Sequence, residues 1–397
     1  MTDFEKIILK GEGKTLEFKA QLPTGNSIAK SAISFSNMAG GKIIIGVEDK
    51  TCKIVGISEK DALDLPDKIS NIIFDCCTPV IIPEIYTIQV LNKTVLVIEL
   101  YPGGLKPYHL KKVGKQKGTY IRVGGTNKIA DDEMIVELER QRRNISLDEE
   151  NDFNYSADAI DVKQLSEDFQ RYTGLELGQN DLLTLKIMNE DSGRFYPTIG
   201  GLLIAGRKEY SEFYRIKCAR FKGNDMLEFI DQKEFSGPLH HQVENTMKFA
   251  MVYLAKSGKI KGLQRDDQYD VPVEAIREAV VNAVVHRDYS ITGADIKFAV
   301  FDDRIEITSP GALPKSLGVE DLLTGRSEIR NRVIARFFKE IKFIEQWGTG
   351  VGRIVQSCQK QGLKTPEFIE RGLFFKVILH KTKKSKVPRK VPRKLWK

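Results

Sequence analysis

Apolar and polar residues alternate in short blocks over the first 140 residues, and the period of the pattern changes along the chain. LEFK at 16–19 and KIIIGVED at 42–49 predict strands, and IYTIQVL and KTVLVIELY predict two more. An apolar stripe in SIAKSAISFSNMAGG predicts a helix that ends at the glycine pair, and DALDLPDKISNIIF and DEMIVELERQRRN predict two further helices. We therefore expect a mixed α/β domain over residues 1–140.

The rest of the chain divides by composition into four parts. Residues 141–161 are polar and acidic with little periodicity, which is typical of a linker. Residues 162–260 are expected to form a middle α/β region, with apolar strands such as IGGLLIAG at 199–206. Residues 261–380 predict another α/β domain, and residues 381–397 form a basic tail. The overall prediction is an α/β (α+β) protein.

Charge and cysteine usage narrow the class of protein. The chain has 397 residues and a net charge of +8, but KTKKSKVPRKVPRKLWK at its end carries nine lysines or arginines and no acid, so the remainder carries −1. That tail predicts either an arm attracted to nucleic-acid phosphates or a solvated linker. No apolar run reaches membrane-spanning length, no signal peptide is evident, and the five cysteines lack C-x-x-C spacing. We expect a cytoplasmic, reduced homo-oligomer without a membrane segment or structural zinc.

The stretch GEGKTLEFKAQ at 11–21 contains glycines and a Lys-Thr pair that are reminiscent of a phosphate-binding loop. The Walker pattern requires a first glycine where Ile8 stands, and a helix where LEFK predicts a strand, so we exclude that loop. What remains is a set of carboxylates, Glu12 and Glu17, beside Lys19. An alternative interpretation is a surface ion pair between Glu17 and Lys19.

A second informative stretch is VPVEAIREAVVNAVVHRDYS at 271–290, which predicts an apolar helix. Glu278 and Asn282 stand four residues apart and therefore share one face of this helix. Buried polar groups are costly without partners, and a metal-bound phosphate ligand would supply them. A pair satisfied by neighbouring backbone groups is the alternative.

Two later segments favour the ligand interpretation. FDDRIEITSPGALP at 301–314 predicts a strand that runs into a turn, and QWGTGVGRI at 346–354 predicts a glycine-rich loop before a helix. Such loops expose backbone N–H groups that hold phosphates at a helix N-terminus. The ordered set ExxxNA, SPGxLP and GTGxGR is more specific than any one of its members.

This set resembles the Bergerat-type ATP-binding fold of DNA gyrase and histidine kinases and, more narrowly, the RecG-like C-terminal module of bacterial proteins described as transcriptional regulators. The resemblance implies that Asn282 binds the Mg²⁺ of ATP, that Glu278 activates water, and that the glycine loop contacts the phosphates. The implied ATP-contacting positions besides Asn282 are Gly311, Gly348, Thr349, Gly350 and Gly352. SPGALP stands where the wider fold has its adenine-binding D-x-G-x-G box, which leaves adenine recognition unassigned.

The N-terminal region resembles the Schlafen-type AlbA-like domain through E-x4-E-F-K, SFSNMAGGKIIIGVED and GTYIRVGGTN. In Schlafen nucleases two glutamates and an aspartate form a metal-dependent RNA-cutting site. The resemblance places these roles on Glu12, Glu17 and Asp49, with Glu48 as the alternative to Asp49 and Lys19 beside a phosphate. Three carboxylates of this kind suit Mg²⁺ or Mn²⁺. Without metal, they should repel one another.

The combined prediction is an ATP-binding protein that acts on RNA or DNA and cleaves it with a metal-dependent site gated by ATP. The alternative is an ATP-responsive DNA-binding regulator without enzymatic activity. A helicase is excluded because no Walker motif is present.

Overall fold

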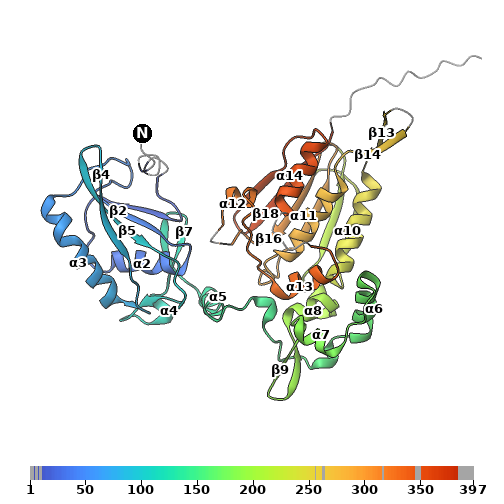
Figure 1. Cartoon of the computed structure of the whole chain (residues 1–397), viewed down its shortest axis with the longest axis horizontal. Coiled ribbons are helices and arrows are strands. Elements are labelled where there is room, and N and C mark those ends of the chain that lie inside the picture. Colours follow the sequence, from blue (N-terminus) through green and yellow to red (C-terminus); the bar gives the residue numbers. More distant parts are fainter. Residues whose placement is uncertain are drawn as a thin grey trace, which may run out of the picture. The chain divides into compact units, whose positions relative to one another are not determined.

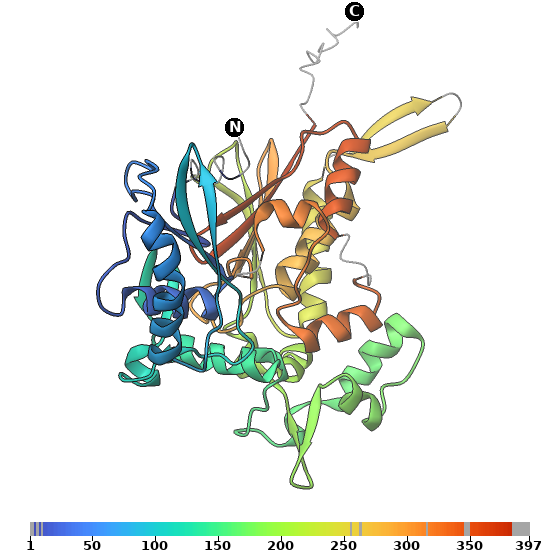
Figure 2. The same cartoon turned by 60° about the vertical axis from the view of Figure 1, so that its left-hand side comes forward.

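The computed structural model describes residues 4, 8, 11–254, 256–261, 264–314, 317–344 and 350–382. It divides into two compact units, Met1–Ile145 (unit 1) and Ser146–Lys397 (unit 2), which are described separately (Figures 1 and 2). No helix among the described residues is long and apolar enough to cross a membrane.

Unit 1 is built on a four-stranded sheet with the order β1-β2-β5-β4, in which β1 and β2 are parallel and the other pairs are antiparallel. Its elements are β1 (Leu16–Lys19), α2 (Ser27–Asn37), β2 (Gly41–Ile45), α3 (Glu59–Cys76), β3 (Cys77–Thr78), β4 (Glu84–Val90), β5 (Lys93–Leu100), β6 (His109–Leu110), α4 (Lys115–Gly118), β7 (Tyr120–Val123), β8 (Thr126–Ile129) and α5 (Asp132–Arg143).

Both faces of this sheet are buried, because successive side chains of a strand point to opposite sides. Ile43 and Ile45 of β2 pack with helices α2 and α3, whereas Ile44 packs on the other face with Phe18 and Val97. Helix α2 also carries buried polar residues, Ser31 and Asn37 among them. The strands and helices predicted for this region are confirmed, with strand β2 ending at Ile45 rather than at Asp49.

Unit 2 contains a six-stranded sheet with the order β12-β11-β15-β16-β18-β17, in which only β11 and β15 pair in parallel. Its elements are η1 (Leu147–Glu149), η2 (Ala157–Ala159), α6 (Val162–Thr173), α7 (Gln179–Thr184), β9 (Met188–Asp191), β10 (Arg194–Pro197), α8 (Ile199–Ala205), α9 (Lys208–Ser211), β11 (Ile216–Phe221), β12 (Phe229–Phe235), α10 (Leu239–Tyr253), β13 (Lys256–Lys261), β14 (Gln264–Tyr269), α11 (Val273–Val285), β15 (Ile296–Val300), β16 (Arg304–Pro310), α12 (Val319–Leu323), α13 (Arg332–Glu340), α14 (Gly350–Lys360), β17 (Glu367–Arg371) and β18 (Phe374–His380).

Helix α11 lies between α10 and α14 and packs on the sheet, as the labelled ribbons in Figure 1 show. Phe298 and Val300 of β15 belong to the large core beneath these helices, whereas Ala299 between them packs into a small cluster with Phe221 and Phe301. The polar face of α11 is therefore held at a fixed place between the sheet and α14, which positions the site described below.

The segment IGGLLIAG is helix α8, so the strand predicted at 199–206 is wrong. Thr198 Oγ1 accepts the N–H of Gly201 at 3.0 Å and caps the helix, and Gly206 ends it with a φ of +72°. A Cβ on Gly201 would lie 2.1 Å from the carbonyl oxygen of Ile187. The helix is buried on most sides, and an apolar run with that burial has no period that separates helix from strand.

Residues 146–152 pack into unit 2 rather than forming an extended tether. The side chain of Asp148 is fully buried, and its two carboxylate oxygens accept the N–H groups of Arg332 at 3.0 Å and Ile334 at 2.9 Å at the start of α13. Burial raises the pKa of Asp148 to about 6, while the bonds from Ser146 and the α13 backbone lower it.

Candidate functional site

Unit 2 contains a cavity of about 190 Å³ between α11, the end of β16 and the start of α14. Four residues of the predicted ATP site line it, namely the predicted catalytic Glu278 and the predicted ATP-contacting Asn282, Gly311 and Gly350. They come from three segments of the sequence, and the fold brings them together around one space. Most of the remaining lining is apolar, with Ile307, Leu313, Val377 and others, and this is the common character of small-molecule sites.

The two polar residues of α11 contact each other and an arginine of α14. Asn282 Nδ2 donates to Glu278 Oε1 at 3.2 Å, which confirms that the two share a helix face. Arg353 Nη2 lies 3.4 Å from Glu278 Oε2 and offsets its charge. Glu278 is largely buried, with 12% of its side chain exposed, and Arg353 is more open at 35%. One positive group therefore faces the cavity beside a carboxylate and an amide.

Gly350 comes so close to this pair that a side chain at its position would force Glu278 to shift. A Cβ there would lie 2.0 Å from Glu278 Oε1 and 3.2 Å from Asn282 Nδ2. Gly350 is also the first residue of α14, where backbone N–H groups lack helical partners and attract anions. The start of α14 thus combines backbone donors with the polar pair of α11.

Gly311 follows β16 on the opposite side of the cavity. Its φ of +120° favours glycine, and a Cβ would lie 2.3 Å from Arg330 Nη1 and 2.9 Å from the backbone N of Asp288. Arg330 donates to the carbonyl of Ala312 and lies 3.4 Å from Asp288. This close packing brings a second guanidinium to the cavity wall.

Of the remaining predicted positions of the glycine loop, only Gly352 belongs to the described part of the chain. Gly348 and Thr349 lie outside the described residues, so their placement stays a prediction. Gly352 is in α14 but does not line the cavity, and its own Cβ position is open, with no other atom within 4 Å.

Among the polar residues of the cavity wall that the sequence analysis missed are Arg353, Arg330 and His286. Arg353 stands inside the quoted GTGVGRI segment, so its spacing of three residues from Gly350 was a usable signal. His286 follows α11, and its surroundings, with burial first and the charge of Arg330 second, lower its pKa to about 4. Its imidazole is therefore neutral at neutral pH.

The acidic group predicted in unit 1 is arranged differently. Glu17 of β1 is 3% exposed and both of its carboxylate oxygens have partners. Oε1 accepts a hydrogen bond from Ser31 Oγ at 2.9 Å and lies 2.9 Å from Lys19 Nζ, and Oε2 lies 2.5 Å from Arg122 Nη1. The ion pair of Glu17 and Lys19 that the alternative interpretation places on the surface is present, but Glu17 is buried and only Lys19 is partly exposed.

Arg122 of β7 belongs to this acidic group, and the sequence analysis missed it. It is 3% exposed and donates to the carbonyl groups of Gly13 and Leu16, each at 3.1 Å, as well as to Asn127 Oδ1 at 3.0 Å. These bonds tie the GEGK loop and β1 to the β7–β8 hairpin. Because Arg122 is 105 residues from Glu17, no local pattern indicates the pairing.

Glu12 and Asp49 lie beside this ion pair. Glu12 Oε1 accepts the N–H of Phe18 at 2.6 Å and lies 3.9 Å from Lys19 Nζ, so the loop folds back on the strand as expected. Burial raises the pKa of Glu12, and the negative charges of Asp49 and Glu17 add to the increase, against the Phe18 bond and Lys19. Asp49 itself is exposed in a turn after β2.

Glu12, Glu17 and Asp49 do not bring three ligand atoms within 4.8 Å of one another in the described part of unit 1. Their charges nevertheless act on each other, and a divalent cation would relieve the repulsion that raises the pKa of Glu12. The expected mutual destabilisation is countered at Glu17, since Lys19 and Arg122 supply two positive charges. Convergence of the three carboxylates on one ion stays a prediction.

Comparison with known proteins gave two family matches. The model described as "Schlafen, AlbA_2" matches residues 12–131, which include the acidic group, and the model described as "Putative ATP-dependent DNA helicase recG C-terminal" matches residues 293–379. The second range contains Gly311, Gly350 and Arg353 but begins after α11. A comparison with curated proteins gave no match.

Among solved structures, the DIP2311 protein from Corynebacterium diphtheriae is similar in fold, with a TM-score of 0.52 and 19% identity over 93% of this chain and 75% of that chain. The N-terminal domain of a RecG-related protein from Nitrosomonas europaea matches 32% of this chain and covers 92% of its own, at 24% identity and a TM-score of 0.25. The chain thus combines a segment that matches the Schlafen AlbA_2 model with a later segment that matches the RecG C-terminal model, as expected from its motifs.

Proposed function

We propose that this protein binds ATP in the cavity of unit 2 and nucleic acid through unit 1, and that ATP controls its action on the nucleic acid. The observation that carries the ATP proposal is the convergence of Glu278, Asn282 and Gly350 on one cavity. The RecG-like match over residues 293–379 supports it.

The residues present fit a magnesium-bound triphosphate. Gly350 lines the cavity, which is open to a ligand, and the start of α14 offers backbone donors. Asn282 and Glu278 would hold the metal and its water, and Arg353 and Arg330 would face phosphate oxygens. A bound magnesium ion would neutralise charge on the phosphates.

The test of the ATP site is calorimetric titration of the full-length protein with ATP and Mg²⁺. We expect binding by the natural protein and its loss in Asn282→Ala, because the amide would hold the magnesium ion on the phosphates. Glu278→Ala should retain binding and lose any hydrolysis. Unchanged affinity in Asn282→Ala at an unchanged melting temperature would contradict the assignment.

The nucleic-acid proposal rests on the AlbA_2 match and on an exposed basic run in unit 1. KKVGKQK at 111–117 carries four lysines and no acid, and all four side chains are exposed. Such a run attracts phosphates independently of sequence. Replacing Lys111, Lys112 and Lys117 by glutamine should weaken binding of labelled RNA and DNA and reduce its salt dependence. Lys115 is left in place because it pairs with Glu139.

Metal-dependent RNA cleavage is the second candidate function, and the Schlafen AlbA_2 match over residues 12–131, which include Glu12, Glu17 and Asp49, supports it. Incubation with labelled tRNA, single-stranded RNA and DNA, with Mg²⁺ or Mn²⁺ and with or without ATP, distinguishes cleavage from binding. Cleavage that Asp49→Ala abolishes, with binding retained, would establish a nuclease. Binding without cleavage under all these conditions would leave the ATP-responsive regulator.

A further inference from the structure

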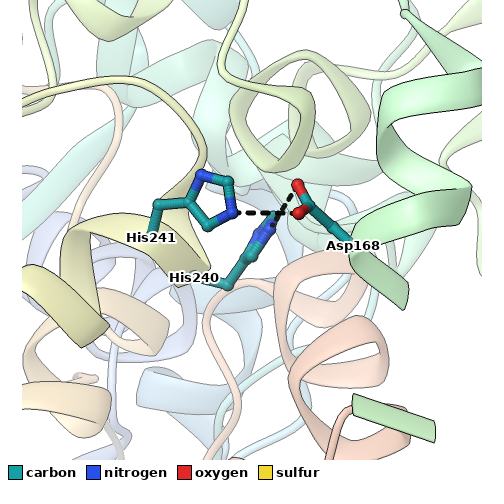
Figure 3. Close-up of side chains that lie close together, drawn as sticks. All are labelled: Asp168, His240 and His241. Carbon is teal, nitrogen blue, oxygen red and sulfur yellow. Dashed lines mark hydrogen bonds and ion pairs between the residues drawn. The ribbon is translucent and has the colours of Figure 1, made fainter. Parts of the chain in front are cut away.

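A compact group of potential metal ligands lies in unit 2 outside the ATP cavity. Asp168 of α6 faces His240 and His241 at the start of α10, as Figure 3 shows. Asp168 Oδ2 lies 3.2 Å from His240 Nε2, and Asp168 Oδ1 lies 3.1 Å from His241 Nε2. It is the only such group of three that the described residues contain.

We propose that Asp168, His240 and His241 form a binding site for a late first-row divalent metal ion such as Zn²⁺, which links α6 to α10. Two imidazoles and a carboxylate are a common donor set for zinc, and they leave a fourth position for water or another oxygen. None of the predicted functions of the chain uses these residues.

The distances fit one ion. Zinc bonds of about 2.0–2.2 Å at tetrahedral angles place neighbouring donor atoms roughly 3.4 Å apart. The two observed nitrogen–oxygen separations of 3.2 and 3.1 Å are close to that value. In Figure 3 both Nε2 atoms point at the same carboxylate, one toward each oxygen. Small side-chain shifts would therefore complete the coordination.

The environment of His240 decides which of its ring nitrogens could bind the ion. Its ring is fully buried, and its Nδ1 has no hydrogen-bond partner among the described residues. A metal bound at Nε2 leaves the proton of the neutral ring on Nδ1, so Nε2, which faces Asp168, is the ring atom that can take the ion. His241 is partly open, with 29% of its side chain exposed, and gives an ion access from solvent.

Arg171 competes for the place of the ion. Its Nη2 lies 3.1 Å from His241 Nε2 and 3.4 Å from Asp168 Oδ1, and it also lies 3.8 Å from Glu244 of α10. The guanidinium occupies the electron-rich side of the cluster and is half exposed, so it can swing away. The proposal therefore requires that a bound metal ion displaces the guanidinium of Arg171. It also requires that the removal of this guanidinium strengthens metal binding.

The experiment is a titration of the full-length protein, freed of metal by chelator, with Zn²⁺ by calorimetry and with Co²⁺ by visible absorption. The natural protein should bind one ion at this site, and its melting temperature should rise with Zn²⁺. His241→Gln and Asp168→Asn should each weaken that binding at least tenfold, since even indirect supports of a metal site contribute that much. Arg171→Gln should strengthen it.

A matched control is His380→Gln, because His380 also pairs with a carboxylate, Glu367 at 2.8 Å, but has no second histidine. Its metal binding should equal that of the natural protein. Equal stoichiometry and affinity in the natural protein and in His241→Gln would overturn the proposal. So would an Arg171→Gln protein that binds zinc more weakly, because the cluster would then depend on Arg171 as an ordinary ion pair.

Discussion

The acidic group of unit 1 and the cavity of unit 2 both contain partly buried carboxylates, but these carboxylates differ in their hydrogen-bond and ion-pair partners. Both carboxylate oxygens of Glu17 have partners, which are the cations of Lys19 and Arg122 and the hydroxyl of Ser31. Glu278 meets an amide and one more distant arginine beside an open cavity. The first arrangement holds elements of the fold together, whereas the second leaves polar groups available to a ligand.

The difference predicts where a substitution harms stability and where it harms binding. A buried charge that loses its partner costs several kcal/mol, since the remaining ion stays desolvated. A polar group beside a cavity can be removed at smaller cost to the fold, but the ligand loses its contact. Four experiments follow from this contrast.

The largest expected effect is on the folding of unit 1. Glu17→Gln should lower the free energy of unfolding by about 3 kcal/mol, because Arg122 loses its charged partner and keeps only its neutral bonds. Asp49→Ala is the control and should change it by less than about 0.5 kcal/mol, because Asp49 is exposed. Denaturant unfolding of both variants tests the comparison, which fails if Glu17→Gln is as stable as Asp49→Ala.

The next effect is on ATP binding by unit 2. Gly350→Ala should weaken Mg²⁺-dependent ATP binding about a hundredfold, or ~2.7 kcal/mol, because the new Cβ would displace Glu278. Gly352→Ala, two residues later in the same helix, has open space around its Cβ and should bind normally. Calorimetry on the two proteins separates a local block from a general effect on α14, and equal losses in both would refute the site.

A smaller effect is expected on the pH dependence of the free energy of unfolding. The pKa of His286 lies near 4 in the folded state and 6.5 when unfolded, so the unfolded chain takes up a proton first as pH falls. Its contribution to stability is complete above pH 6.5 and declines toward pH 4 by up to ~1.4 kcal/mol per pH unit. His286→Gln should flatten the dependence of the unfolding free energy on pH in that window. Parallel curves for the two proteins would contradict the assigned shift.

The smallest effect concerns the basic tail, whose residues 383–397 lie outside the described part of the chain. Ending the chain after Thr382 removes eight lysines or arginines but keeps the contact of Lys381 with Asp270 at 3.5 Å. If the tail contacts phosphates, the logarithm of nucleic-acid affinity should depend less steeply on salt concentration in the shortened protein than in the full-length protein. Identical slopes would make the tail a linker and leave the lysines of unit 1 as the binding groups.

Local periodicity predicted much of this fold, because alternation and helical spacing are written in neighbouring residues. Strand β1, helix α2 and helix α11 are confirmed for that reason, as is the contact of Glu278 with Asn282 one helical turn away. The strand predicted at 199–206 was wrong, because the apolar run that forms helix α8 has no period that separates helix from strand.

Local periodicity could not predict which side chains from distant segments of the chain contact each other. The partner of Glu17 is 105 residues away, and Asp168 meets His240 across 72 residues, so only the folded chain brings them together. For Gly348 and Thr349 the ATP-contacting role stays a prediction, and the same holds for a shared ion at Glu12, Glu17 and Asp49. The pairing of charges, rather than the presence of charges, decides which acidic group forms a site, and sequence spacing does not carry that information.

The burial of Asp148 has a consequence for how unit 2 can be divided. The backbone bonds between Glu150 and Ile199 and between Asp152 and Pro197 add to the cap that Asp148 places on α13. Residues 146–152 thus behave as a peptide ligand of unit 2 that happens to be covalently attached. A fragment that begins at residue 162 would lack this piece, and a synthetic peptide of residues 146–161 added in trans should bind the fragment and restore its folded state.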